Sequence, residues 1–146
     1  MQRTWRFPAI AAFLLVALAM PVRGQSFGFP WWRDAQFQRD LSLSPDQSGR
    51  IDAVFQKTIP TLREKRTELD AQEEELSRMI AANADEGSVI KQVDKVEAIR
   101  SHMNKTRTLM LLRMRQILSP EQRTKLNQKY EQWEKDHRRE GRGKNE

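Results

Sequence analysis

The 146-residue chain contains no cysteine, and this absence excludes both a disulfide framework and a metal site built from thiolates. Aromatic residues make up only 8% of the sequence, whereas 32% of the residues are charged. These proportions leave little material for a globular core. They are typical of long helices that pack side by side, so we expect an all-α protein.

Long apolar runs are also scarce. The main one, residues 9–20, is well short of the roughly 20 residues that span a bilayer. Arg3 and Arg6 precede this run, and residues 22–24 follow it as a candidate cleavage site, so residues 1–24 are predicted to be a signal peptide. An uncleaved anchor is the alternative. Because no cysteine follows, a lipoprotein anchor is excluded.

The formal net charge of +6 would ordinarily suggest nucleic-acid binding. An exported chain does not meet the genome, however, and no groove-reading motif occurs in the sequence. We therefore expect no nucleic-acid partner.

The most informative pattern is a five-residue phrase that occurs twice, as Leu43-Ser44-Pro45-Asp46-Gln47 and as Leu118-Ser119-Pro120-Glu121-Gln122. In each copy the serine can cap a helix, the proline suits the first helical position, and the glutamine can complete a capping box. The acidic residue adds about 0.3–1 kcal/mol beside the positive end of the helix dipole. Each phrase therefore predicts the start of a helix.

Apolar spacing and turn residues divide the rest of the chain into helices. Residues 25–40 are predicted to be a linker and a short N-terminal helix over 31–41, which either packs over the following helices or forms an aromatic docking segment. One long helix over 45–83, bent at Pro60, leads to a turn at 83–87. Ser88 is predicted to cap a second long helix that reaches Leu118. The final helix runs from Pro120 to about Arg138, and residues 139–146 form a polar, disordered tail.

A heptad pattern in the second long helix predicts a coiled-coil-like seam. The seam residues are Val89, Val96, Met103, Met110 and Ile117, with Val93, Arg100, Arg107 and Met114 on the companion positions. The short turn makes the two long helices antiparallel, which places Arg107 near Glu64 and Arg100 near Gln72 and Glu73. We expect ion pairs across the hairpin.

One segment of the second long helix is a candidate binding surface. Between Ala98 and Pro120 no acidic residue occurs, and basic side chains alternate with methionines and leucines. Methionine adapts to varied apolar partners, and arginine contacts acidic or aromatic groups. One interpretation is a client-binding surface formed by Arg100, Met103, Arg107, Met110 and Met114. In the other, Leu109, Leu111 and Leu112 bury against the final helix and a second subunit, with a solvated arginine fringe.

Metal binding and catalysis have little support in these residues. Glu134, His137 and Glu140 share one helical face and could supply nitrogen and oxygen ligands to zinc, although a solvated charged face is the alternative. The sequence has no Gly-rich phosphate loop, and neither histidine lies in a nucleophile or carboxylate constellation. We predict no enzymatic activity and no cofactor other than this candidate zinc.

The repeated phrase resembles the Leu-Thr-x-x-Gln motif of the Spy/CpxP family of periplasmic proteins, matched here as Leu-Ser-x-x-Gln over 43–47 and 118–122. The resemblance implies a family domain over 41–138, periplasmic localisation, and a bent antiparallel hairpin that forms a cradle-shaped homodimer. It also implies ATP-independent, chaperone-like binding of unfolded or misfolded envelope proteins under stress. ZraP-like and heavy-metal-resistance relatives imply an alternative, a periplasmic heavy-metal-responsive protein that modulates a membrane-bound sensor.

Overall fold

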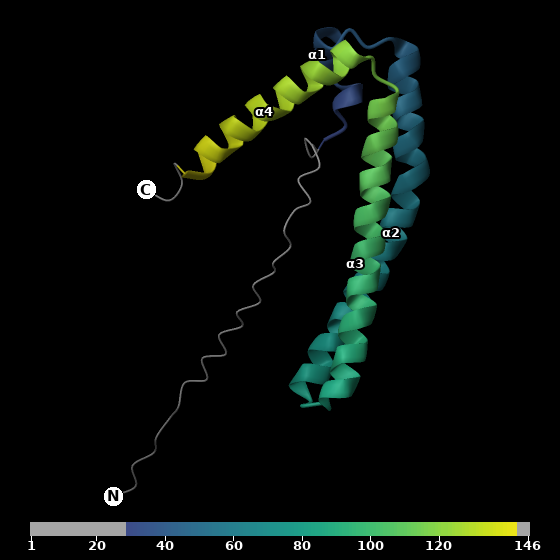
Figure 1. Cartoon of the computed structure of the whole chain (residues 1–146), viewed down its shortest axis with the longest axis vertical. Coiled ribbons are helices and arrows are strands. Elements are labelled where there is room, and N and C mark those ends of the chain that lie inside the picture. Colours follow the sequence, from purple (N-terminus) through teal and green to yellow (C-terminus); the bar gives the residue numbers. More distant parts are fainter. Residues whose placement is uncertain (1–28, 143–146) are drawn as a thin grey trace, which may run out of the picture.

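The computed structural model describes residues 29–142, so the predicted signal peptide lies outside the described residues. The elements are a 3₁₀ turn η1 (Trp31–Arg33), α1 (Ala35–Asp40), α2 (Pro45–Ala81), α3 (Glu86–Gln116) and α4 (Pro120–Arg142). Helices α2 and α3 pack antiparallel as a hairpin, with the other elements at one end of it (Figure 1). We call that end the base and the end with the α2–α3 turn the tip. The predicted all-α hairpin with flanking helices is confirmed.

Helix α2 begins sharply because the first copy of the repeated phrase caps it. Ser44 Oγ accepts a hydrogen bond from Gln47 N, and Gln47 Oε1 accepts one from Ser44 N, each at 3.1 Å. The helix then runs unbroken through Pro60, whose missing N–H deprives the carbonyl of Gln56 of its helical donor. The hairpin is bowed along its length, as a long helix with an internal proline predicts (Figure 1).

The cap of α3 differs from the prediction. Asp85, rather than Ser88, is the N-cap: its Oδ1 accepts from Ser88 N (2.8 Å) and its Oδ2 from Ser88 Oγ (2.7 Å). These hydrogen bonds from Ser88 lower the pKa of Asp85. Because a carboxylate is favoured at the positive end of a helix, α3 starts at Glu86, two residues before the predicted start.

The seam between α2 and α3 is present. Met114 is buried at its predicted companion position, but the other companion positions differ from those predicted. The central heptad residues are buried as expected: Val96, Met103 and Met110. The companion that faces α2 is Ile99, three residues after Val96, whereas Arg100 and Val93 are exposed. Arg100 lies at the edge of the seam because its long side chain can keep the guanidinium in water there.

A buried glutamine pair also lies in this seam. Gln92 is 5% exposed, and its Nε2 donates to Gln72 O (3.0 Å) and Gln72 Oε1 (2.9 Å). Sliding one helix along the other would leave this buried amide without partners, at a cost of about 1–3 kcal/mol. The pair therefore helps to set the register of the hairpin.

The N-terminal segment covers the base in two pieces, not as the single predicted helix. Asp34 separates them because its extended backbone ends η1 and its carboxylate caps α1 by accepting from Phe37 N (2.9 Å). Trp31 and Trp32 are buried, and Trp32 Nε1 donates to Asp52 Oδ1 on α2 (2.8 Å). The interpretation in which this segment packs over the hairpin is confirmed.

Helix α4 leaves the base at an angle to the hairpin (Figure 1). It continues beyond the predicted end at Arg138, so it includes the start of the segment predicted as a polar tail. Lys129 attaches α4 to the N-terminal segment, since it forms an ion pair with Asp40 and lies 4.8 Å from the centroid of the Phe37 ring. Within residues 29–142, no helix has the length and apolar character needed to cross a membrane.

Candidate functional site

The two copies of the repeated phrase meet at the base of the hairpin. Gln47 Nε2 donates to Gln122 Oε1 (2.8 Å), and Gln122 Nε2 donates back to Gln47 Oε1 (3.0 Å). Each Nε2 also donates to the carbonyl that precedes the other copy, Gln47 to Ile117 O (3.2 Å) and Gln122 to Ser42 O (3.1 Å). We call this reciprocal pair the amide clasp.

Both amides of the clasp use all their hydrogen-bonding groups. Besides the other glutamine, each Oε1 accepts from the N-cap serine of its own helix, Ser44 N at 3.1 Å and Ser119 N at 2.9 Å. A primary amide offers two donors and two acceptor lone pairs, so neither side chain has a group left for a ligand. The clasp is therefore structural, and it joins the start of α2 to the start of α4.

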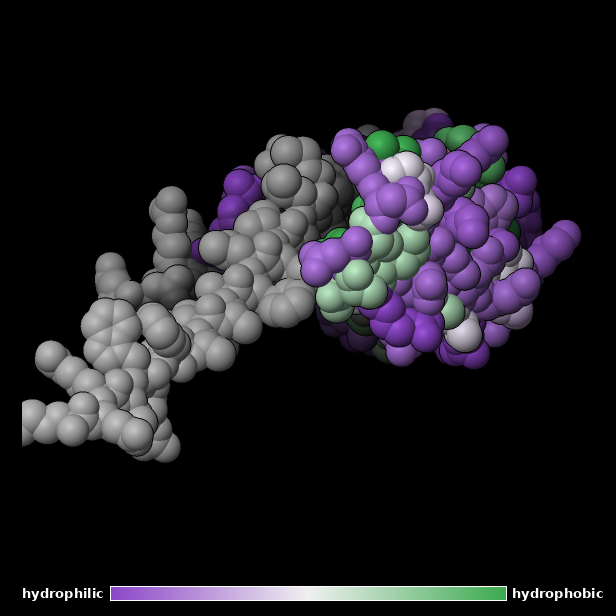
Figure 2. Space-filling model, turned by 90° about the horizontal axis from the view of Figure 1, so that it is seen from below, coloured by the Kyte–Doolittle hydropathy of each residue, from purple (hydrophilic) through white to green (hydrophobic). Residues whose placement is uncertain are grey.

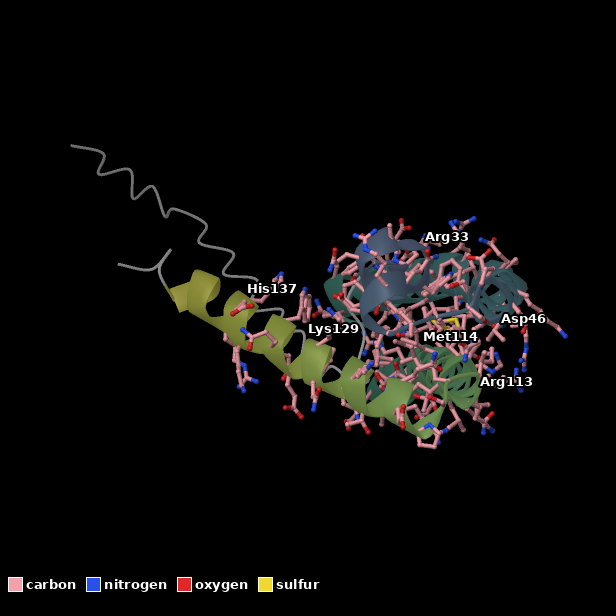
Figure 3. All side chains as sticks on the ribbon, turned by 90° about the horizontal axis from the view of Figure 1, so that it is seen from above. Arg33, Asp46, Arg113, Met114, Lys129 and His137 are labelled. Carbon is pink, nitrogen blue, oxygen red and sulfur yellow. The ribbon has the colours of Figure 1, made fainter. Side chains whose placement is uncertain are left out.

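The three methionines of the predicted client-binding set lie in the core of the chain. Met103, Met110 and Met114 are 8%, 7% and 2% exposed. Figure 3 shows Met114 in the interior at the base, while the adjacent Arg113 points outward. These methionines stabilise the hairpin, and direct contact between them and a client would require α2 and α3 to separate.

Arg100 and Arg107 complete that set and are exposed. Arg100 forms ion pairs with Glu73 across the hairpin and with Glu97 on its own helix, and the hydrogen bond to Glu73 is the largest cause that raises the pKa of Arg100. The predicted ion pair across the hairpin is thus confirmed for Arg100. Among the ion pairs of the described residues, none joins Arg107 to Glu64. Client binding by this set stays a prediction.

Helix α4 carries the predicted metal ligands Glu134, His137 and Glu140, of which the Glu140 side chain lies outside the described residues. Glu134 pairs with Arg138 (2.9 Å), and His137 Nδ1 lies 2.9 Å from Trp133 O. His137 is far along α4, away from the hairpin (Figure 3). No group of three His, Cys, Asp or Glu that could hold a metal ion occurs among the described residues. Because Glu140 belongs to the predicted set and its side chain is not described, zinc binding by this set stays a prediction.

Comparison with protein-family models matches residues 9–125, most of the chain, to heavy-metal resistance proteins. The chain belongs to the heavy-metal resistance family. This family is part of the Spy/CpxP/ZraP group defined by the LTxxQ motif, so the resemblance carried by the two Leu-Ser-Pro-x-Gln phrases is confirmed at the level of that group. Members of the heavy-metal resistance family are generally non-enzymatic. Comparison with curated proteins and with solved structures finds no significant match.

The sequence analysis missed two contacts that hold the base together. One is the amide clasp: each glutamine was predicted only to complete the cap of its own helix, and a contact between Gln47 and Gln122 was not considered. The feature of the sequence that could have indicated the clasp is the glutamine at the same position of both copies. A capping box uses the side-chain oxygen of that glutamine and leaves its side-chain N–H donors without a partner. The other is the hydrogen bond from Trp32 to Asp52, and no motif in the sequence marks that pair.

Proposed function

We propose that this protein is an exported, non-enzymatic component of heavy-metal resistance that acts by binding other proteins, with a membrane-bound sensor domain as its partner. The observation that carries the proposal is the match of residues 9–125 to the heavy-metal resistance family. The proposed periplasmic location rests on the signal-peptide pattern of residues 1–24.

The geometry of the described residues supports action through a protein partner. Gln47 and Gln122, the glutamines of the two motif copies, form the amide clasp and have no hydrogen-bonding group left for a ligand. The role of these two residues is therefore structural. Of the candidate ligands on α4, Glu134 pairs with Arg138, and His137 Nδ1 lies against the Trp133 carbonyl. A hairpin with exposed charged faces is suited to docking on another protein.

Deletion of the gene tests this function directly. We expect the deletion strain to tolerate lower concentrations of at least one of zinc, copper and nickel, and the intact gene to restore tolerance. A complementing gene without the codons for residues 1–24 should not restore it, because the product would stay in the cytoplasm. Unchanged tolerance to all three metals would overturn the proposal.

Chaperone-like binding of unfolded envelope proteins is a second candidate function. It is favoured by a side of α3 on which exposed apolar residues lie beside exposed arginines: Ile90 (51% exposed), Val93 (38% exposed), Arg100 and Arg107. Successive residues of this set are three or seven positions apart and so share one face of the helix.

An aggregation assay separates the two candidates. Residues 25–146 are added without ATP to an unfolding client at near-stoichiometric ratio, with chelator or with added zinc. The chaperone candidate predicts suppression that is indifferent to metal and is lost in an Ile90→Gln, Val93→Gln variant. The matched control is Ala71→Gln, an exposed position on α2. The absence of suppression by the wild-type protein in every condition would eliminate the chaperone candidate.

A further inference from the structure

Helices α3 and α4 meet at the base in an elbow, because α4 leaves the hairpin at an angle (Figure 1). Arg115 lies in the last turn of α3, and its Nη2 donates to Asn127 Oδ1 on α4 (2.8 Å). Arg123 lies four residues before Asn127, so the two share one face of α4. The two arginines therefore approach each other across the elbow. We call Arg115, Arg123 and Asn127 the elbow cluster.

The elbow cluster holds two like charges together. Arg115 and Arg123 are both half-buried. Burial is the largest cause that lowers the pKa of Arg115, and the positive charge of Arg123 lowers it further. Two guanidinium groups that are close together and partly withdrawn from water repel each other more strongly than they would in solvent. An anion between them would offset that repulsion.

The chain places little negative charge near the elbow cluster. Among the described residues, Arg123 forms no ion pair and no side-chain hydrogen bond. The positions three and four residues before and after either arginine hold no Asp or Glu. Residues 98–129 contain eight Lys or Arg and a single acidic residue, Glu121. Glu121 is two positions from Arg123, so it lies on a different side of α4.

This concentration of positive charge distinguishes the base from the other end of the hairpin. The surface seen from the tip end is also mainly hydrophilic (Figure 2). The sign of the charge differs, however, because residues 68–75 of α2, in the half nearer the tip, contain five acidic residues and no Lys or Arg. An approaching anion is therefore attracted to the base and repelled by the acidic part of α2.

We propose that the elbow cluster binds a phosphate group between the guanidinium groups of Arg115 and Arg123. The planar fork of N–H groups on a guanidinium matches the oxygens of a phosphate, and such charge-assisted hydrogen bonds are stronger than neutral ones. Asn127 is a positioning residue, because its side-chain oxygen fixes the direction of Arg115. The proposal does not depend on the proposed function.

Two sources can supply this chemistry, inorganic phosphate and the headgroup of an anionic lipid. Leu111 and Leu112 precede Arg115 by one turn and so lie on its side of α3. Leu112 is 49% exposed, which offers apolar surface beside the cluster. A lipid would place its headgroup on the arginines and its acyl chains toward these leucines, whereas free phosphate would use the arginines alone.

Thermal unfolding of residues 25–146 in increasing phosphate tests the proposal, since a ligand of the folded chain raises the unfolding temperature. We expect phosphate to raise it more than chloride at equal ionic strength, and Arg123→Gln to lose most of this difference. In calorimetric titration, Arg123→Gln should raise the dissociation constant for phosphate about tenfold or more. Arg123→Lys should lie between this variant and wild type, because an ammonium keeps the charge and lacks the fork.

The matched control is Arg63→Gln, which removes an exposed arginine of α2 that forms no ion pair among the described residues. Phosphate also stabilises folded proteins by exclusion from their surface, and this control measures that general effect. Circular dichroism confirms that each variant keeps its helices.

Asn127→Asp separates phosphate binding from a purely structural role of the cluster. This variant supplies a carboxylate from within the chain, where the proposal places the anion. We expect it to unfold at a higher temperature than wild type without phosphate, and to respond to phosphate no more than to chloride. If Asn127 had a structural role alone, phosphate would raise the unfolding temperatures of wild type and variant equally.

Sedimentation with lipid vesicles distinguishes the two sources. Binding to phosphatidylglycerol vesicles but not to phosphatidylcholine vesicles, lost in Arg123→Gln and kept in Arg63→Gln, would assign the site to an anionic headgroup. Phosphate binding without sedimentation would assign it to free phosphate. The proposal is overturned if wild type, Arg123→Gln and Arg63→Gln respond equally to phosphate and sediment equally with both kinds of vesicle.

Discussion

Asp52 is a single residue that holds the N-terminal segment against α2. Its Oδ1 accepts hydrogen bonds from Trp32 Nε1 (2.8 Å) and from Arg33 Nε (2.7 Å). The hydrogen bond from Trp32 is the largest cause that lowers the pKa of Asp52, and Arg33 lowers it further. The ionised carboxylate therefore stabilises the folded chain.

This lowered pKa makes the stability of the base sensitive to acid. Because the folded pKa lies below the unfolded value of about 3.9, the stabilisation is present above about pH 4 and is lost as the pH falls through the folded pKa. Asp52→Asn keeps an acceptor for Trp32 but loses the charge. We expect it to be less stable than wild type at pH 7 and to lose less stability than wild type between about pH 4 and 2. Urea unfolding followed by tryptophan fluorescence measures the unfolding free energy of each protein at pH 7 and at lower pH. An equal decrease in the two proteins between about pH 4 and 2 would contradict the expectation.

Among the elements, the amide clasp couples the start of α2 to the start of α4. Removal of one glutamine leaves the amide of the other without two of its partners, so Gln47→Ala and Gln122→Ala should each cost about 1–3 kcal/mol of unfolding free energy. The double variant should cost less than the sum, with a coupling energy of about 0.5–3 kcal/mol. Denaturant unfolding of the four proteins measures this cycle. Gln128→Ala, at an exposed position on α4, is the control, and additive losses would show that the clasp does not couple the helices.

The two faces of α3 should respond differently to truncation. Met110 is 7% exposed and packs in the base core, so Met110→Ala should lower the unfolding free energy by about 2–5 kcal/mol. Leu112 lies two residues later and is 49% exposed. Leu112→Ala should therefore change the unfolding free energy of the monomer by less than about 0.5 kcal/mol. Unfolding at high salt and low protein concentration makes the comparison. Similar losses in both variants would place Met110 outside the core.

The helix starts were predictable from sequence because cap chemistry is local: Pro45 and Pro120 open α2 and α4 where the phrase predicts. The seam was predictable only in part. In a heptad pattern the second seam residue can lie three or four residues after the first. Ile99, three residues after Val96, faces α2 because of the position of α2, and the sequence of α3 alone does not determine that position. The amide clasp could not be derived from either cap, since it depends on both ends of the hairpin returning to one place.

Across the whole molecule, apolar burial is concentrated toward the base. Buried tryptophans and methionines form the base core, whereas the core nearer the tip consists of fewer and smaller side chains: Leu69, Val96, Ile99 and Met103. Between residues 70 and 91, no described residue is fully buried. The helices are therefore held unequally along their length.

This gradient predicts a pattern of amide hydrogen exchange. Local opening requires less free energy where few apolar contacts hold the backbone, so amides near the tip, over 76–90, should exchange faster than those over 48–58 and 108–116 near the base. Exchange followed by mass spectrometry on the monomer measures this difference. Equal protection at the two ends would mean that the buried side chains do not set local stability.

The order in which the hairpin assembles follows from where its ends lie. The turn at the tip closes a loop of a few residues, whereas the amide clasp joins positions 75 residues apart, and chain entropy opposes the longer closure more strongly. We therefore expect the contacts between α2 and α3 to form first at the tip and then progressively toward the base, with the amide clasp forming last. Folding would then begin at the tip, which is the end that opens most easily. A contact that forms after the transition state slows unfolding and leaves the folding rate nearly unchanged. The amide clasp at the base would therefore determine the lifetime of the folded chain.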